Sequence, residues 1–173
     1  MAASHGLRTG TLHDINRGDY HVVLPEPDQQ FFGQENTFIG ARRYVFVARE
    51  EKPRVMGYYT LSGSCFEKEY FPGKTQQKRV PYKNVPSVTL GRLAIDNSIQ
   101  RQGYGETLVT HAMKVVYHAS QAVGIHGMFV EALSDDAKNF YLGLGFILLK
   151  RENSNALFYP TKSIEELFEA QDE

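Results

Sequence analysis

Apolar and polar positions along the chain alternate in blocks that predict strands separated by helices. Residues 44–48 (YVFVA) and 55–63 (VMGYYTLSG) are rich in β-branched and aromatic side chains, and the turn between them makes them antiparallel partners. Residues 88–95 (VTLGRLAI) form a further apolar strand. Before these strands the pattern is weak: residues 7–12 fit either a first strand or an unstructured start, and residues 29–39 fit a short helix.

The longest helical period follows the 88–95 strand. Residues 105–123 carry small and apolar side chains at helical spacing, and this stripe consists of Leu108, Ala112, Val115, Ala119 and Ala122. The opposite side is polar and includes His111 and His118, which we expect to be exposed. The histidines have no spacing that suggests a metal site, so no chemistry is assigned to them. Gly124 is a typical helix stop.

The remaining pattern completes an alternation of strands and helices. It predicts strands over residues 127–133, 146–150 and 157–160, and helices over residues 135–145 and near the C-terminus. Ser134 is a good N-cap for the first of these helices, and Thr161 or Ser163 for the second. A helical or irregular segment is predicted for residues 65–84, with Pro81 and Pro86 on either side of its end. Antiparallel strands followed by this alternation indicate an α+β fold.

The composition is that of one soluble domain. The chain has 173 residues, 42% hydrophobic and 23% charged, and its net charge of −1 does not indicate a polyanion partner for the protein as a whole. Cys65 is the single cysteine, which excludes internal disulfides and fits a reducing compartment. No run has transmembrane length and the start lacks a signal-peptide layout, so we expect one domain over residues 1–173, located in the cytoplasm.

Charge is unevenly distributed along the chain. Basic residues gather before and within the 88–95 strand, and the candidate RNA contacts among them are Lys74, Lys78, Arg79 and Arg92. The tail after Lys162 carries acidic residues and no basic ones. Solvated charge is the usual role of such runs and is favoured on composition alone, whereas a local patch for RNA phosphates is the sharper alternative.

A glycine-rich loop, residues 100–106 (QRQGYGE), joins the 88–95 strand to the long helix. Gly103 and Gly105 allow a tight turn and leave backbone N–H groups uncovered, and the positive end of the helix dipole lies behind them. Such a corner binds phosphate. The loop lacks the Gly-Lys-Ser/Thr ending of a P-loop and the third glycine of a dinucleotide fingerprint.

The loop matches the pattern Gln/Arg-x-x-Gly-x-Gly/Ala at Gln100, Gly103 and Gly105, and a second element, NFYLGLGF at residues 139–146, follows it. Together they resemble the GNAT superfamily of N-acetyltransferases. The resemblance implies a mostly antiparallel central sheet, splayed between two strands and flanked by helices, with acetyl-CoA as cosubstrate and no metal. The coenzyme contacts that it implies are Leu93, Ala94, Ile95, Gln100, Arg101, Gln102, Gly103, Tyr104, Gly105, Glu106 and Asn139.

Tyr141, in the second element, has two interpretations. A tyrosine on an apolar helical stripe is more often a core residue. The resemblance instead implies a general acid, which protonates the thiolate that leaves when a thioester transfers its acyl group. It also places the acetyl carbonyl against the backbone N–H groups of residues 93–95, which stabilise the developing oxyanion. Asn139 is explained equally well as an exposed polar residue of the helix.

No general base stands out in the sequence, and this favours one class of nucleophile. A lysine side chain, with a pKa of about 10.4, needs help to lose its proton, whereas an α-amino group, at about 7.7–8.0, is already substantially neutral. The amine of an aminoacyl ester is easier still to deprotonate, because the ester withdraws electrons. A site without a dedicated base therefore suits an aminoacyl ester, although a chain of waters is another way to remove the proton.

The phrases VTLGRLAID, QRQGYGE, GMFVEALSDDAKNFYLGLGF and LFYPTKSIEEL resemble more closely the GNAT toxins of bacterial toxin–antitoxin pairs. This resemblance covers the chain from about Tyr44 onward, while the earlier residues depart from the pattern. It implies acetylation of aminoacyl-tRNA, a block of translation, a ribbon-helix-helix antitoxin and a homodimer. The alternatives are an N-acetyltransferase of a small amine or protein N-terminus, and a coenzyme-binding regulator without turnover.

Overall fold

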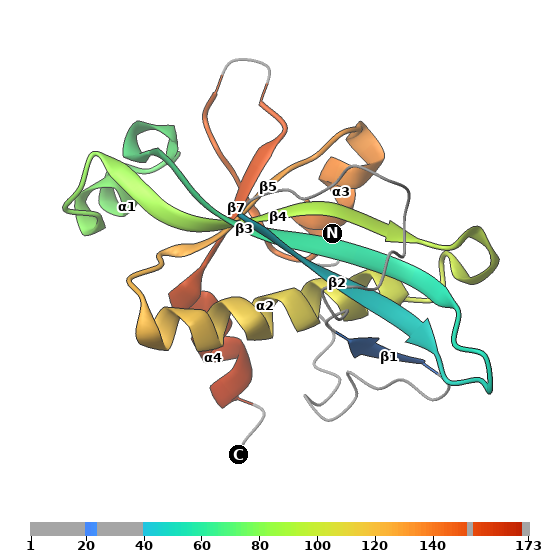
Figure 1. The fold of residues 1–173 in the computed structure, drawn as a ribbon. Helices are drawn as coiled ribbons and strands as arrows, with labels where there is room; N and C mark the ends of the chain where they lie inside the picture. The colour runs from blue at the N-terminus through green and yellow to red at the C-terminus, as the bar shows by residue number, and fades with distance from the viewer. Residues whose placement is uncertain (1–19, 24–39, 152–153, 171–173) are drawn as a thin grey trace.

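All seven strands of the described residues belong to one sheet, in the order β1-β2-β3-β4-β5-β7-β6 (Figure 1). The structure is a computed structural model that describes residues 20–23, 40–151 and 154–170. The strands are β1 (Tyr20–Val23), β2 (Ala41–Ala48), β3 (Val55–Glu67), β4 (Asn84–Ile95), β5 (Gly127–Glu131), β6 (Ile147–Leu148) and β7 (Ala156–Pro160). Only β4 and β5 are parallel neighbours, so the predicted mostly antiparallel sheet is confirmed.

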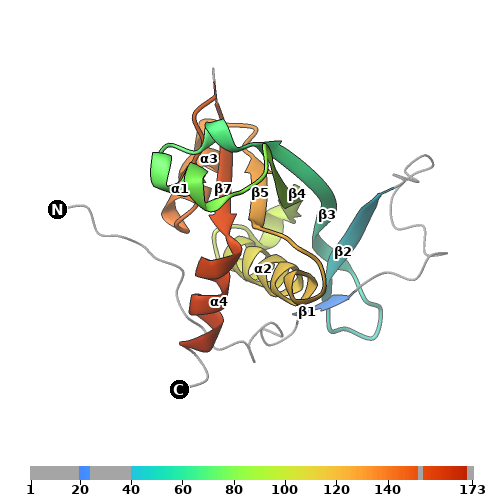
Figure 2. The ribbon, with the colours of Figure 1, turned by 90° about the vertical axis from the view of Figure 1, so that its left-hand side faces the viewer.

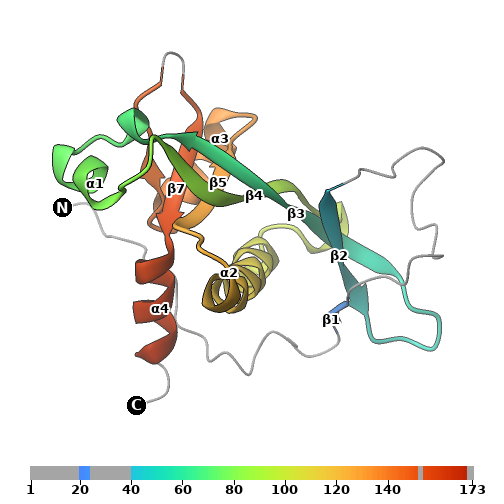
Figure 3. The same cartoon turned by 60° about the vertical axis from the view of Figure 1, so that its left-hand side comes forward.

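The helices lie on both faces of this sheet. They are α1 (Lys74–Arg79), α2 (Tyr104–Ala122), α3 (Asp135–Gly143) and α4 (Thr161–Glu169), with the 3-10 turns η2 (Lys68–Tyr70) and η3 (Asn97–Ile99). Figures 2 and 3 show α2 and α4 together on one side of the sheet and α1 at one end of it. The predicted elements at residues 7–12 and 29–39 lie outside the described residues, and β1 was not predicted.

Strand alternation gives the two faces separate cores. On β5, Met128 and Val130 belong to the larger apolar cluster, which also contains buried residues of α2, α3 and α4. Phe129, between them, packs with Phe158 of β7 in a smaller cluster beside η2 and α1. Successive side chains of a strand point to opposite faces. We call the face of Met128 and Val130 the α2 face, and the face of Phe129 and Phe158 the far face.

β3 and β4 are longer than the sequence predicts, because both extend into residues 65–84. Pro86 therefore lies within β4, opposite Cys65, rather than before the strand. The Pro86 carbonyl accepts a hydrogen bond from His126 N at 2.9 Å, so its missing N–H also falls on the β5 side. The ladder with β5 begins only at Ser87, so the proline interrupts no strand pairing.

The buried face of α2 covers more of the helix surface than the predicted apolar stripe, and its centre lies at a different position around the helix. Its fully buried residues are Leu108, Val109, Ala112, Met113 and Val116. Ala122 is exposed, and His111 is half-buried, so the prediction of an exposed His111 is wrong. The sheet covers α2 on one side and α4 covers it on another, where the rings of Tyr117 and Phe168 lie 5.7 Å apart. His118 is exposed as predicted.

One of the two predicted helix caps is present. The Ser134 hydroxyl accepts a backbone hydrogen bond at 3.1 Å in the first turn of α3, which confirms that cap. α4 begins differently, since its N-cap is Pro160 and both Thr161 and Ser163 lie inside the helix. The Thr161 hydroxyl donates to the Ile125 carbonyl at 3.0 Å, which ties the start of α4 to the connection between α2 and β5.

Candidate active site

β4 and β5 separate in the middle of the sheet. Their parallel register ends at the pair Leu90 and Val130. β5 stops one residue later, at Glu131, whereas β4 continues along β3 to Ile95. The second half of β4 therefore has a strand neighbour on one side only, and we call the gap on its other side the splay.

The free edge of β4 presents the backbone of Leu93 and Ile95. Asp96 N donates to the Met56 carbonyl of β3 at 2.7 Å. Because alternate residues of a strand direct their N–H and C=O groups to opposite sides, Ala94 also faces β3. The backbone groups of Leu93 and Ile95 consequently face the splay. Of the three predicted coenzyme contacts on β4, these two lie at the splay and Ala94 does not.

A β-bulge lies where the splay begins. The register of β3 and β4 shifts between Tyr59 and Leu61, so that Thr60 faces both Gly91 and Arg92. A Cβ atom on Gly91 would lie 2.3 Å from Thr60 Oγ1, so any other residue here would require Thr60 to shift. Bulges bend a strand and increase its twist, which fits the divergence of β4 from β5 at this point.

The turn after β4 is held by its own side chains. Asp96 caps η3, and hydrogen bonds from Ser98 hold the pKa of the Asp96 carboxyl below its usual value. Gln100 Nε2 donates to the Ile95 carbonyl at 3.0 Å and to Asn97 Oδ1 at 2.9 Å. The first residue of the predicted coenzyme motif thus fixes the turn between the strand and the glycine-rich loop.

The glycine-rich loop enters α2 through left-handed backbone. Arg101 has a φ of 60°, and Gly103, the N-cap of α2, has a φ of 86°. Thr107 N donates to the Gly103 carbonyl at 3.2 Å, which is the first backbone hydrogen bond of α2. The backbone N–H groups of residues 104–106 lie before this bond. They lie at the positive end of the helix dipole, a geometry that binds phosphate.

α3 brings Tyr141 to the same place. A Cβ atom on Gly105 would lie 3.4 Å from Phe140 Cζ, so the Phe140 ring lies against the start of α2. The neighbouring Tyr141 is buried, and its ring centroid lies 5.2 Å from those of Phe140 and Phe146. Asn139 is exposed on this helix. The strand, loop and helix that the sequence singles out are therefore adjacent.

The Tyr141 hydroxyl has the properties of a proton donor. Burial raises the pKa of Tyr141 to about 12, so the phenol is protonated at neutral pH. Within the part of the chain that the structure describes, no group hydrogen-bonds this hydroxyl. Buried hydroxyls usually have a partner, and an unsatisfied one calls for an explanation such as a ligand.

The predicted RNA contacts do not lie together. Lys74, Lys78 and Arg79 are exposed on α1, at the end of β4 where the strand begins (Figure 1). Arg92 is exposed at the bulge, beside the splay. Arg92 is eight positions along β4 from Asn84, and at about 3.3 Å per residue the start of β4, which follows α1, is roughly 25 Å from the bulge.

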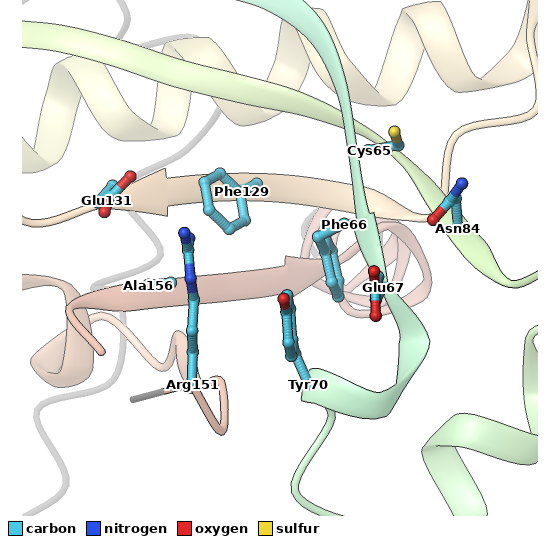
Figure 4. A pocket seen from close by; sticks show the side chains of 9 residues that line it. All are labelled: Cys65, Phe66, Glu67, Tyr70, Asn84, Phe129, Glu131, Arg151 and Ala156. Atoms are coloured by element: carbon cyan, nitrogen blue, oxygen red, sulfur yellow. The ribbon is translucent and has the colours of Figure 1, made fainter. Parts of the chain in front are cut away.

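Two features near the site have no signal in the sequence. On the α2 face, the Tyr59 hydroxyl and His111 Nδ1 hydrogen-bond at 2.5 Å, and the Tyr44 ring stacks on that of Tyr59 at 4.9 Å. On the far face, a cavity of about 350 Å³ contains Phe129 and Arg151 among its lining residues (Figure 4). The contributing strands are far apart in sequence, so only strand register brings these residues together.

Two further observations concern metals and membranes. Across residues 20–23, 40–151 and 154–170, no group of three or more His, Cys, Asp or Glu side chains is arranged to hold a metal ion. None of the helices in these ranges is long and apolar enough to cross a membrane.

The chain is similar to a curated protein of stated activity. A tRNA-acetylating toxin of Mycobacterium tuberculosis (strain ATCC 25618 / H37Rv) is 32% identical over 93 residues, which are 54% of this chain and 55% of the relative. The chain therefore spans about half the length of this curated relative.

Solved structures cover more of the chain. A tyrosine-to-phenylalanine mutant of KacT is 66% identical, with a TM-score of 0.72 over 74% of this chain and 75% of the other. AtaT complexed with acetyl-methionyl-tRNAfMet is 62% identical, with a TM-score of 0.71 and the same coverage. An AtaT tyrosine-to-phenylalanine mutant bound to acetyl-CoA and the C-terminus of the antitoxin AtaR is 46% identical, with a TM-score of 0.69 over 87% and 99%.

The family match covers the elements that build the site. The acetyltransferase (GNAT) domain matches residues 41–148, which include β2 to β6, the glycine-rich loop and α3. The chain belongs to the GNAT acetyltransferase family.

Proposed function

We propose that this chain is an acetyl-CoA-dependent N-acetyltransferase that acetylates the α-amino group of aminoacyl-tRNA and so blocks translation. The observation that carries the proposal is the buried Tyr141 hydroxyl, without a hydrogen-bond partner among the described residues, beside the start of α2. The stated activity of the mycobacterial relative and the acetyl-methionyl-tRNAfMet complex of AtaT support the choice of acceptor.

The splay and the loop fit the shape of the coenzyme. A pyrophosphate suits the amides at the start of α2, because Gly103 and Gly105 place no side chain over them. An extended arm suits the free edge of β4, where Leu93 and Ile95 can pair with it as with an added strand. When bound there, acetyl-CoA supplies the acetyl group as a thioester. Asn139, exposed on α3, is a candidate contact for the arm.

The proposed transfer needs few side chains. The amine nitrogen forms a bond to the acetyl carbon, and the bond from that carbon to sulfur breaks. The backbone N–H group of Leu93 or of Ile95 stabilises the charge on the carbonyl oxygen, and the other pairs with the arm. Tyr141 gives its proton to the departing sulfur and regains one through solvent, which also takes the proton that the amine loses. Amine and thioester thus become amide and thiol.

We also propose the regulation that toxin–antitoxin pairs use. A ribbon-helix-helix antitoxin neutralises the chain, which acts in the cytoplasm as a homodimer. The AtaT complex with the C-terminus of AtaR supports an antitoxin that binds by its tail. Expression of the chain alone is expected to arrest growth, and expression of Tyr141→Phe is not. Normal growth with abundant soluble wild-type protein would argue against the toxin assignment.

The basic residues of α1 are proposed to contact tRNA phosphates away from the chemistry. Replacing both Lys78 and Arg79 by glutamate should weaken charged tRNA and flatten its salt dependence, since each single-strand phosphate contact adds about −0.7 to the slope of log affinity against log salt. Acetyl-CoA binding should be unchanged, because α1 is distant from the splay. Filter binding at several salt concentrations measures the slope, and wild-type slopes in the variant would assign these residues to solvent.

The proposed activity is tested by offering labelled acetyl-CoA with total charged tRNA, polyamines and a peptide mixture. Label is expected in the tRNA fraction, attached through the amino acid. Gly103→Glu should abolish the labelling, because a bulky anion then lies at the pyrophosphate site. Label in polyamines or peptides alone would move the assignment to a small-amine or N-terminal acetyltransferase, and no label anywhere would favour a regulator without turnover.

A further inference from the structure

The cavity on the far face lies behind the paired half of β4, and it extends toward the splay along β5. Its walls come from the ends of β3 and η2, from the start of β4, from β5 and from the segment around Arg151 (Figure 4). Glu131, at the end of β5, is part of the lining and is the residue after the last β4–β5 pair. One end of the cavity therefore reaches the point where β4 and β5 separate.

The cavity and the proposed proton donor lie on opposite faces. Tyr141 packs in the cluster of the α2 face, with Val130. Phe129 and Glu131, the neighbours of Val130 along β5, line the cavity on the far face. A thioester held in the splay would thus be reached by Tyr141 from one side and by a molecule in the cavity from the other. The Glu131 end of the cavity is therefore the side from which a nucleophile would approach the thioester carbonyl, opposite the proposed proton donor.

The lining combines flat apolar rings with separate charges. Phe66, Tyr70 and Phe129 supply aromatic walls, and the Arg151 guanidinium lies 5.9 Å from the centre of the Tyr70 ring. Glu131 and Arg151 point into the same space in Figure 4 but form no ion pair within 4.0 Å. The charges are available to a ligand, in positions set by the rings.

These groups match the chemistry of an aminoacylated nucleotide. Its base is a flat ring that stacks on aromatic and guanidinium planes, its phosphate is an anion for an arginine, and its amino group is a hydrogen-bond donor for a carboxylate. Residues two apart on one face of a strand are separated by about 6.6 Å, so Glu131 and Phe129 lie a few bond lengths apart, as do the amine and the base of such a molecule.

We propose that the far-face cavity binds the aminoacylated terminal nucleotide of the acceptor, with Glu131 holding the α-amino group at the splay and Arg151 holding the nucleotide against the aromatic wall. This rests on the proposed function, and it assigns the acceptor to the side of the sheet away from Tyr141. Glu67, at the opposite end of the cavity, has no role in this arrangement.

The test compares two pairs of variants. Both variants of a pair remove the same charge, one at a proposed binding residue and the other at a residue without a role in the proposal. Glu131→Gln is matched by Glu67→Gln, at the other end of the cavity, and Arg151→Ala is matched by Lys150→Ala, its neighbour along the chain. Initial rates with charged tRNA give kcat and KM at several salt concentrations. Calorimetry with acetyl-CoA and thermal melting show that each variant binds coenzyme and is folded.

Arg151→Ala should raise KM for charged tRNA by about 10-fold and make the salt slope shallower by about 0.7, the effect of one phosphate contact. Arg151→Lys should restore the slope, because it keeps the charge. Glu131→Gln should lower kcat/KM by roughly 10- to 100-fold, as expected for a hydrogen bond to a charged group, and leave the slope unchanged. Acetyl-CoA affinity should stay at the wild-type value in all variants.

If wild type acetylates charged tRNA and Glu131→Gln and Arg151→Ala match their controls, the assignment of the cavity is overturned and the proposed function stands. If wild type labels no charged tRNA, the proposed function itself fails and this assignment falls with it.

Discussion

Two buried tyrosines on the α2 face differ in what their hydroxyls contact. Tyr59 of β3 hydrogen-bonds His111 of α2, and the two rings lie against Tyr44. Tyr141 of α3 is surrounded by aromatic rings, and its hydroxyl has no partner in the described part of the chain. Burial raises the pKa of both phenols. The two residues therefore share their burial and the direction of their pKa shift, and they differ in the hydrogen bonding of their hydroxyls.

The difference separates a structural role from a chemical one. A satisfied buried hydroxyl contributes to stability and specifies how α2 packs on β3. A hydroxyl without a protein partner is instead open to a hydrogen bond from solvent or from a ligand. The same residue type thus anchors a helix at one position and marks a reaction site at the other. Each of the following predictions tests one side of this contrast.

Tyr141→Phe has the largest expected effect, and it acts on rate alone. Loss of the proton donor should lower the acetylation rate by roughly 10²–10⁴. Stability should be unchanged or slightly higher, because the lost hydroxyl had no protein partner among the described residues. Single-turnover rates and urea denaturation measure the two quantities. A wild-type rate in this variant would make Tyr141 a packing residue, like Tyr59.

Acid should weaken the Tyr59 region through His111. Burial, with a smaller effect of Lys114, lowers the pKa of His111 to about 4, below its unfolded value near 6.5. The unfolded chain binds a proton first, so this contribution to stability is complete above pH 6.5 and is lost as pH falls toward 4. The loss should be about 3 kcal/mol, measured by urea denaturation at each pH.

The histidines of α2 provide the control for that titration. His111→Gln should flatten the dependence of unfolding free energy on pH between about 6.5 and 4, whatever its effect on stability at neutral pH. His118→Gln, on the exposed side of the same helix, should keep the wild-type slope. Equal slopes in all three proteins would mean that His111 titrates as an exposed histidine does.

Much of what distinguishes these two regions can be predicted from the sequence. The glycine-rich loop, the α3 element and Tyr141 are local patterns, and Ser134 caps α3 as predicted. The Tyr59–His111 pair was missed because α2 is covered on two sides, which moves its buried face away from a simple stripe. The far-face cavity was missed for a different reason: Phe66 and Phe129 come from separate strands, Arg151 comes from the segment between β6 and β7, and the three meet only through the pairing of the sheet.

Tyr59→Phe should have a smaller effect, on stability rather than rate. The substitution leaves the half-buried His111 Nδ1 without its partner, which should cost about 1–2 kcal/mol. The rate per folded molecule should remain within a few-fold of wild type, because the Tyr59 hydroxyl is bonded to His111 of α2 and has no part in the proposed transfer. Urea denaturation and active-site-normalised rates test both parts, and a rate loss as large as that of Tyr141→Phe would contradict the contrast.

The smallest expected effect concerns the rate at alkaline pH, which should not decline through ionisation of Tyr141. The protonated phenol is the active form of Tyr141, and burial raises its pKa to about 12. Its deprotonation should therefore leave the rate unchanged up to about pH 10, where an ordinary tyrosine would be half ionised. Single-turnover rates from pH 7 to about 10 measure this, with the amino acid joined to tRNA by an amide in place of the labile ester. Tyr59→Phe serves as the reference, because it should give a profile of the same shape. A decline with an apparent pKa near 10 in both proteins would show that Tyr141 is solvated in the working complex, and that its burial in the protein alone does not persist when substrate is bound.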